Sequence, residues 1–314
     1  MTSPKRKLLP WAAILGGVMA AILPAGAPAL GKPLAPPNVT AASVYVVNAD
    51  TAQSLYEKNA DKAYHILSLT KLITAYVLVE RTSGQLTDTV TVTQAHIRPG
   101  SSAGLRRGDV WTLADLLYGT LLMSGNDASV AIADHVGRAL LAQENKKGDP
   151  IARFVQDMRA AAASLGAKRT QFADPYGLSA SNVSTARDFG LIGQTVFRDR
   201  RILPYWACPR RSLTIGGPQA RTVTLDSTIE ILGEDGILGA KTGSHVGKNM
   251  YHLIAGWRAP NGETIVTVVL GSKRNAARYD DMRAIIAALP RDFPQLADPA
   301  TAAIAAPGGT SACR

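Results

Sequence analysis

A serine and a lysine three residues apart, Ser68 and Lys71, have the residue types and the spacing for nucleophilic chemistry. Residues three apart on a helix share one face, so the hydroxyl and the amine would lie within hydrogen-bonding reach. A serine hydroxyl becomes a good nucleophile when a neighbour takes its proton, and a desolvated lysine near a second cation can take it. The alternative is a capping serine beside a solvated lysine, because this pattern also arises by chance.

Two other polar clusters stand out later in the chain. Ser124-Gly125-Asn126 follows the apolar run 116–123, which brings polar side chains to the end of a buried segment. Lys241-Thr242-Gly243 ends a glycine-containing, strand-like run, where a ligand or another backbone can approach closely. Its ammonium and hydroxyl groups could receive a carboxylate. Taken singly, the first cluster also fits a helix-capping turn, and the second an edge-strand lysine followed by a turn.

The elements that would position these clusters can be predicted from periodicity. Segment 42–57 alternates around a turn at 48–50, and the runs 252–257 and 264–270 flank Pro260-Asn261-Gly262, so each predicts a β-hairpin. We expect the two hairpins to form one antiparallel sheet.

Helical periodicity begins at Ser68 and dominates 112–197, with Gly137 and Gly166 as expected helix stops, and a last helix is expected near 279–289. The first and last helices should cover the sheet, and the middle helices should form an all-helical lobe. The expected fold class is therefore α/β in an α+β arrangement.

The first 31 residues have the three parts of a secretory signal peptide. Basic residues at 5–7 precede an uncharged apolar run at 8–23, and small residues follow at 25–31. We expect cleavage near Ala29 or Gly31 and export to the periplasm or the medium. The alternative is an uncleaved anchor, which would associate the protein with a membrane. From residue 291 the chain becomes rich in Ala, Pro and Gly, and we expect a flexible tail over 291–314.

Composition excludes several other classes of protein. A chain of 314 residues that is 46% hydrophobic can bury a large core, so extensive disorder is excluded. The formal charge of +10 falls to +7 without the three basic residues at 5–7, a mild basic bias that does not indicate nucleic acid binding. Cys208 and Cys313 are too few for a zinc cluster, and their pairing stays open. The five histidines lack metal-ligand spacing, so we expect no metal or other cofactor.

The conjunction of Ser-x-x-Lys, Ser-x-Asn and Lys-Thr-Gly, in this order, is far more specific than any one of them. With it, the chain resembles the penicillin-recognising serine hydrolases, and among these the low-molecular-mass D-alanyl-D-alanine carboxypeptidases. The stretches 67–76, 124–128, 174–178 and 184–188 support the resemblance, which covers roughly 42–289. It implies a β-lactamase or transpeptidase-like fold and a single catalytic domain at 32–290.

The resemblance also implies roles for individual residues. Ser68 would be the acylated nucleophile, Lys71 its general base, and Ser124 a proton relay toward the leaving group. Asn126 would orient Lys71 and the substrate amide. The other substrate-binding residues that the resemblance implies are Lys241, Thr242, Gly243, Ser244 and Arg278. Among them, Arg278 would have a supporting role. Backbone N–H groups of Ser68 and Ser244 would form an oxyanion hole.

The implied activity is removal of the last D-Ala from peptidoglycan stem peptides that end in D-Ala-D-Ala, with β-lactams as covalent inhibitors. Cleavage of D,D cross-links by an endopeptidase is the first alternative. A β-lactamase is disfavoured because segment 164–186 contains no glutamate. A non-catalytic cell-wall binder would not require a nucleophile and a base.

Two details of the sequence complicate the assignment to this family and of its nucleophile. Ser244-His245 follows the Lys-Thr-Gly cluster where the family usually has an aromatic residue or His and then Thr, which leaves the substrate side-chain preference open. Segment 100–104 also satisfies the Gly-x-Ser-x-Gly pattern of nucleophile elbows, but Arg-Pro precedes it and Arg-Arg-Gly follows, in place of a strand and a helix. We therefore do not expect a nucleophile there.

Overall fold

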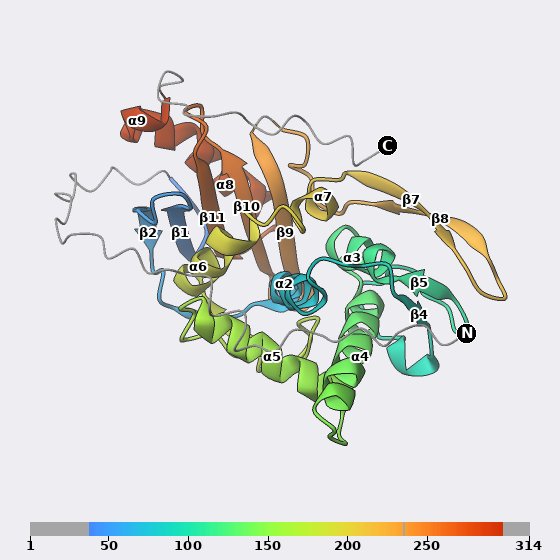
Figure 1. The fold of residues 1–314 in the computed structure, drawn as a ribbon. Helices are drawn as coiled ribbons and strands as arrows, with labels where there is room; N and C mark the ends of the chain where they lie inside the picture. Colours follow the sequence, from blue (N-terminus) through green and yellow to red (C-terminus); the bar gives the residue numbers. More distant parts are fainter. Residues whose placement is uncertain (1–37, 235, 298–314) are drawn as a thin grey trace.

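The protein is built around a five-stranded antiparallel sheet (Figure 1). The structure, a computed structural model, describes residues 38–234 and 236–297, so the expected signal peptide lies outside the described residues. The strand order is β2-β1-β11-β10-β9. The strands are β1 (Ser43–Asn48), β2 (Ser54–Lys58), β9 (Ile237–His245), β10 (Met250–Arg258) and β11 (Thr264–Ser272). Both predicted hairpins are confirmed, and β1 pairs with β11 to join them.

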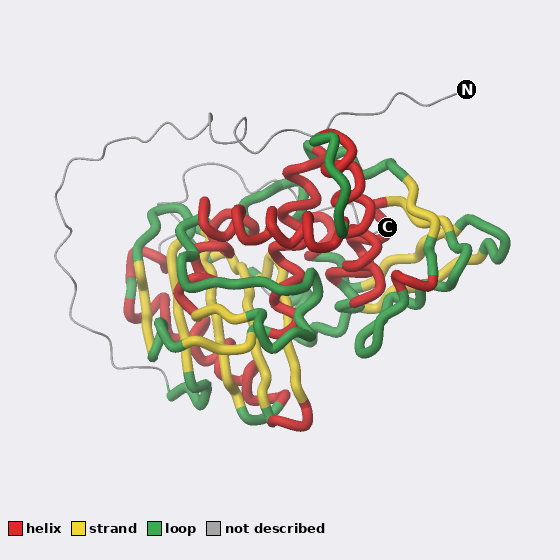
Figure 2. The backbone as a smooth tube through the Cα atoms, turned by 90° about the horizontal axis from the view of Figure 1, so that it is seen from below, coloured by secondary structure: helices red, strands yellow, loops and turns green. Residues whose placement is uncertain are grey.

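Alternation along the strands creates two separate cores. On β1, Val44 and Val46 face one core, whereas Tyr45 and Val47 face the other. Successive side chains of a strand point to opposite faces, so a fully apolar strand must be covered on both sides. The sheet is therefore a middle layer with helices packed on both of its faces (Figure 2).

Helix α8 (Asn275–Asp292) covers one face through Met282 and Ile285, and the short α9 (Pro294–Ala297) follows it. The helix continues through Pro290, and Leu296 is only 1% exposed. The prediction that a flexible tail begins at 291 was wrong for residues 291–297, because Leu296 packs into the same apolar core. Residues 298–314 lie outside the described residues.

Helix α6 (Ala186–Val196) covers the opposite face of the sheet by packing on β1 and β11. Two glycines allow this close approach: a Cβ at Gly190 would lie 2.3 Å from the Tyr45 ring, and one at Gly193 would lie 2.6 Å from Val266. The expectation that the first helix covers the sheet was wrong. That helix, α2 (Lys71–Thr82), instead lies between α6 and the helical lobe and is buried on nearly every side.

The helical lobe contains α3 (Leu113–Leu121), α4 (Asn126–Gln143) and α5 (Pro150–Ser164). Gly166 has φ +83° just after α5, as a helix stop requires. Gly137, however, lies inside α4, so the prediction of a stop there was wrong. A Cβ at this glycine would lie 1.9 Å from the carbonyl oxygen of Pro150, which shows that it permits close contact with the start of α5.

Smaller elements connect the lobe to the sheet. The short strands are β3 (Ala63–His65), β4 (Thr89–Thr91), β5 (Val110–Thr112) and β6 (Val183–Thr185), and the short helices are η2 (Leu67–Thr70), η3 (Gln94–His96), η4 (Val246–Lys248) and α7 (Leu203–Trp206). A further hairpin, β7 (Arg210–Ile215) and β8 (Arg221–Asp226), projects as an arm in Figure 1 and was not predicted. In the described part of the chain, no helix is both long enough and apolar enough to cross a bilayer.

Candidate active site

The start of α2 holds Ser68 and Lys71 together. Ser68 lies in the single turn η2, and Lys71 is the first residue of α2. The Lys71 Nζ atom donates a hydrogen bond to Ser68 Oγ over 2.9 Å. Ser68 is partly accessible, whereas Lys71 is fully buried. The hydroxyl can therefore meet a ligand while the amine stays shielded from water.

Lys71 has two further acceptors. Its Nζ atom lies 2.8 Å from Asn126 Oδ1 and 2.7 Å from the backbone oxygen of Tyr176. Burial lowers the pKa of Lys71 to about 7, while the carboxylates of Asp174 and Asp127 act in the opposite direction. At neutral pH a large fraction of this amine is therefore unprotonated, as a general base must be.

Ser124 lies in the link between α3 and α4 and has a left-handed backbone with φ +55°. A residue other than glycine is strained there by about 1–3 kcal/mol, and such strain persists only where the surroundings enforce it. The Ser124 hydroxyl accepts a hydrogen bond of 2.9 Å from Lys241 Nζ. The link thus places Ser124 toward β9 and Asn126 toward α2.

The loop 99–105 supports this link. The Asn126 side-chain nitrogen donates to the Pro99 oxygen over 2.7 Å, and the Asp127 carboxylate accepts from the backbone N–H of Ala103 and the hydroxyl of Ser102. Ser102 is the serine of the Gly-x-Ser-x-Gly pattern. Its hydroxyl donates to a carboxylate in a loop that is neither preceded by a strand nor followed by a helix. Its surroundings are therefore not those of a nucleophile elbow.

Strand β9 brings Lys241 and its neighbours to the same place from the edge of the sheet. Lys241 is fully buried, and Thr242 is nearly so. A Cβ at Gly243 would lie 3.3 Å from the backbone nitrogen of Ser68, so glycine lets the strand pass close to the nucleophile. Burial lowers the pKa of Lys241 well below its usual value, and the charges of Lys71 and Arg278 lower it further.

Arg278 reaches this strand from α8. Its guanidinium donates to Ser244 Oγ over 2.8 Å and to the backbone oxygens of Gly243 and His252. His252 is buried and receives the Gly271 N–H at Nδ1, so its Nε2 carries the proton and donates to the His65 oxygen. Burial lowers the pKa of His252 to about 4, which keeps its ring neutral. These contacts hold the end of β9 against the turn that carries Ser68.

The predicted site residues therefore come together at the junction of α2, the lobe and β9. Sequence reasoning missed the Tyr176 carbonyl, because a backbone acceptor has no residue signature. It also missed the way its loop is held: the Asp174 carboxylate accepts the N–H groups of Tyr176, Gly177 and Ser179. The Asp-Pro-Tyr-Gly stretch was the available signal.

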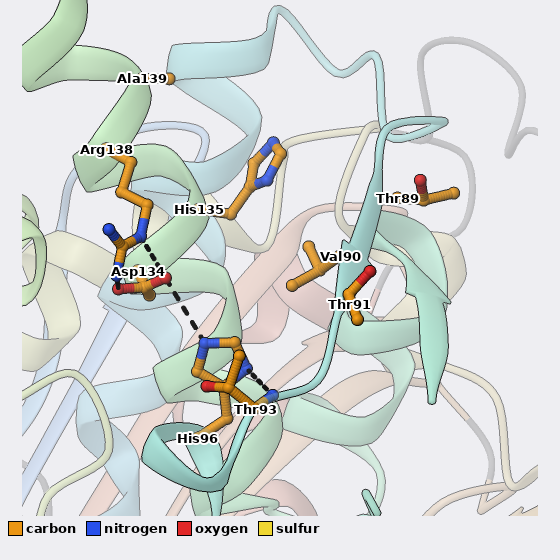
Figure 3. Close-up of a pocket in the computed structure, with 9 residues that line it drawn as sticks. All are labelled: Thr89, Val90, Thr91, Thr93, His96, Asp134, His135, Arg138 and Ala139. Atoms are coloured by element: carbon orange, nitrogen blue, oxygen red, sulfur yellow. Dashed lines mark hydrogen bonds and ion pairs between the residues drawn. The ribbon is translucent and has the colours of Figure 1, made fainter. Parts of the chain in front are cut away.

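A cavity of about 500 Å³ lies elsewhere, between β4 and α4, and contains none of the predicted site residues (Figure 3). In it, Arg138 forms an ion pair with Asp134, and His96 caps its own turn by accepting the Thr93 N–H. Within residues 38–234 and 236–297, no group of three or more His, Cys, Asp or Glu side chains could hold a metal ion. The buried Cys208 thiol donates to the Arg210 oxygen, and Cys313 lies outside the described residues.

Several known proteins are similar to this chain. Residues 31–274 match the family described as D-alanyl-D-alanine carboxypeptidase. The D-alanyl-D-alanine carboxypeptidase of Streptomyces sp. (strain K15) is 30% identical over 260 residues, which are 80% of this chain and 87% of that protein. DacC of Escherichia coli (strain K12), also named a D-alanyl-D-alanine carboxypeptidase, is 31% identical over 267 residues, but these are only 61% of its length.

Solved structures are similar along most of the chain as well. The Streptomyces K15 DD-transpeptidase has a TM-score of 0.73 and 29% identity, covering 81% of this chain and 98% of that one. Penicillin binding protein 5 of Haemophilus influenzae has a TM-score of 0.69 and 25% identity, covering 81% and 71%. The predicted transpeptidase-like fold is thus confirmed. Together with the family match over residues 31–274, these similarities establish that the chain belongs to the D-alanyl-D-alanine carboxypeptidase family of serine peptidases.

Proposed function

We propose that this protein is a serine-type D-Ala-D-Ala carboxypeptidase that acts on peptidoglycan stem peptides through an acyl-enzyme on Ser68. The observation that carries the proposal is the buried Lys71 amine, which lies 2.9 Å from Ser68 Oγ and has a pKa of about 7. An ordinary lysine, fully protonated at neutral pH, could not accept a proton from serine. The same site would be acylated by β-lactams, as in the family.

In the first step, Ser68 Oγ attacks the carbonyl carbon of the penultimate D-Ala while Lys71 takes the hydroxyl proton. The negative charge then develops on the carbonyl oxygen, toward which we assign the backbone N–H groups of Ser68 and Ser244. Arg278 supports this assignment because it fixes Ser244 through its side chain. Asn126 fixes Lys71 through the bond to Nζ.

Release of D-alanine requires a proton for the leaving nitrogen. Ser124 is suited to pass on the proton that Lys71 took from Ser68, because its hydroxyl can donate to the leaving nitrogen while it accepts from Lys241. This transfer leaves Lys71 neutral again. Lys241 and Thr242 would receive the terminal carboxylate of the substrate. A carboxylate arriving beside the buried Lys241 restores the charged form that burial disfavours, so binding and proton position are linked. Water, activated by Lys71, then hydrolyses the ester and frees Ser68.

Labelling with a fluorescent penicillin tests the acylation step. The wild-type protein should become covalently fluorescent, and Ser68→Ala should not. Ser102→Ala is the matched control, since it removes the other candidate serine and should still be labelled. Labelling that persists in Ser68→Ala but disappears in Ser102→Ala would transfer the nucleophile to the loop 99–105.

A second experiment separates carboxypeptidase from endopeptidase activity. Incubation with a diacyl-Lys-D-Ala-D-Ala peptide should release free D-alanine, whereas Lys71→Arg should release almost none, because a guanidinium does not give up its proton near neutral pH. Cleavage of cross-linked muropeptides without any release of D-alanine would favour the endopeptidase.

We further propose that residues 1–31 are a signal peptide and that the catalytic domain begins after it, in an exported protein. The basic and apolar segments of the first 31 residues support this. Mass spectrometry of protein recovered from the periplasm or the medium should show a chain that starts near residue 30 to 32. A full-length chain retained in the membrane fraction would instead indicate an uncleaved anchor.

A further inference from the structure

The arm formed by β7 and β8 contains none of the predicted site residues, yet both ends of β8 connect to the segment that carries two of them. The arm leaves the body of the molecule at α7 and ends beside β5 (Figure 1). The segment in question joins α3 to α4 and carries Ser124 and Asn126. We call residues 122–126 the α3–α4 link.

The tip of the arm lies against the segment 104–110. Gly216 and Val110 exchange two backbone hydrogen bonds of 3.0 and 3.1 Å. Gly217 has φ +99°, and a Cβ there would lie 2.4 Å from the Gly108 oxygen. Only glycine permits this conformation and this approach together, so the turn of the arm is shaped to fit this segment.

Arg221, the first residue of β8, binds the same segment with its side chain. Its guanidinium donates to both oxygens of the Asp109 carboxylate over 2.6 and 2.8 Å, and to the Gly104 oxygen over 3.2 Å. The Asp109 side chain is buried and also accepts the Arg106 N–H. Because a guanidinium fork matches a carboxylate in both distance and plane, this pair fixes the orientation of the segment as well as its position.

The bound segment is continuous with the loop 99–105, which holds Asn126. The Ser101 oxygen accepts the backbone N–H of Asn126 over 2.8 Å, and the Pro99 oxygen accepts its side-chain N–H over 2.7 Å. The other side-chain atom, Asn126 Oδ1, lies 2.8 Å from Lys71 Nζ. The position of the loop therefore determines the position of the amide that orients the general base.

The far end of β8 holds the other end of the α3–α4 link. Thr228, two residues after β8, donates its backbone N–H and its hydroxyl to the Leu122 oxygen over 3.2 and 3.3 Å. Ser124, with its left-handed backbone, lies between Leu122 and Asn126. A strained conformation persists only where its surroundings enforce it, and here one strand of six residues fixes the link on both sides.

We propose that the arm is a positioning element of the active site and that Arg221 is its positioning residue, which acts on the reaction through Asn126. Arg221 contacts Asp109 and Gly104, and the loop 99–105 transmits its effect. This inference rests on the proposed function, because it takes Lys71 as the base that Asn126 orients. A shift of Asn126 would misalign Lys71 with Ser68, and a misplacement of about 1 Å can cost about a hundredfold in rate.

The test measures the rate constant and the final extent of Ser68 labelling by a fluorescent penicillin. The extent reports the fraction of folded molecules, whereas the rate constant reports how well the reacting groups are placed. Arg221→Gln should lower the rate constant about tenfold. Arg221→Lys should fall between this variant and wild type, because an ammonium does not form the bidentate pair.

Arg210→Gln is the matched control. Arg210 lies in β7 of the same arm and forms an ion pair with the exposed Asp226 on β8, away from the loop 99–105. Its replacement removes an arginine–carboxylate pair from the same hairpin and should leave the rate constant within about twofold of wild type. An equal loss in Arg210→Gln and Arg221→Gln would contradict a specific role of Arg221.

A charge-neutral double variant separates positioning from folding. Arg221→Gln leaves the buried Asp109 carboxylate without its ion-pair partner, which should reduce the extent of labelling. Asp109→Asn combined with Arg221→Gln removes that charge, so it should restore the extent but keep the slow rate constant. Recovery of the wild-type rate constant in the double variant, or an unchanged rate constant in Arg221→Gln, would overturn the inference.

A double-mutant cycle tests the route through Asn126. Added to Asn126→Ala, Arg221→Gln should cost less than about threefold in rate constant, because the amide that it positions is already gone. A full tenfold loss in both backgrounds would show that Arg221 acts independently of Asn126 and would refute the route. Absence of Ser68 labelling in wild type would instead refute the proposed function.

Discussion

The acidity of Lys71 predicts the pH dependence of acylation. Its pKa is lowered to about 7, chiefly because the amine is fully buried. The neutral amine is the form that can accept the Ser68 proton, so the rate should rise with pH and level off above the pKa. With a pKa of about 7, about 1% of the amine is neutral at pH 5 and about 90% at pH 8. The second-order rate constant should therefore rise about a hundredfold between pH 5 and pH 9.

The assay is the rate of covalent labelling by a fluorescent penicillin in buffers of constant ionic strength, measured with denaturing gels. Asp174→Asn should move the midpoint to lower pH, because the Asp174 carboxylate raises the pKa of Lys71. Asp226→Asn, on the exposed strand β8, is the control and should leave the midpoint in place. A rate that is flat between pH 5 and pH 9, or a midpoint near the ordinary lysine value of 10.5, would refute Lys71 as the base.

The remaining predictions concern stability and the carboxylate site. Gly137→Ala should destabilise the fold by about 1–3 kcal/mol in urea unfolding, because its Cβ would lie 1.9 Å from the Pro150 oxygen. Gly148→Ala should change stability by less than about 0.5 kcal/mol, because its Cβ would make only an ordinary contact of 3.7 Å with Leu141. The pKa of His252 is about 4 in the folded protein, against an ordinary value of 6.5, so between these pH values the unfolded chain binds a proton that the folded protein does not. About 3 kcal/mol of the free energy of unfolding should therefore be lost as the pH falls from 6.5 to 4. The His252→Gln variant should lose less stability over the same range. Lys241→Met should raise KM for D-Ala-D-Ala peptides far more than for an analogue with an amidated end, and equal effects on both would argue against a carboxylate site.

The sequence predicted helices and strands well where they depend on a few neighbouring residues. The two hairpins are examples, because alternation and turn residues act over a few positions. The grouping of Ser68, Lys71, Ser124 and Lys241 was expected from the resemblance, and the hydrogen bonds from Lys71 to Ser68 and from Lys241 to Ser124 lie at the junction of α2, the lobe and β9.

The errors share a physical cause, which is contact between segments distant in sequence. Gly137 was expected to end a helix, but it is a glycine because the start of α5 packs against α4 at this position. Likewise, the residues around Gly190 do not indicate that the Tyr45 ring packs against it. The covering of the sheet by α6, the burial of Leu296 and the use of the Tyr176 carbonyl likewise depend on tertiary packing. Such contacts override the intrinsic preference of a residue for a helix or a strand, and they produce no periodic pattern in the sequence.

The pairing of β1 with β11 has a consequence for how the protein acquires activity. The first strand of the sheet pairs with a strand more than two hundred residues later, and Lys241 follows Ser68 by 173 residues. Closing so long a chain segment is slow, and a nascent polypeptide that ends before residue 272 lacks the strand that joins the two halves of the sheet. A chain that stops before β11 should therefore form neither the complete sheet nor the arrangement of Ser68 and Lys241 that the sheet supports.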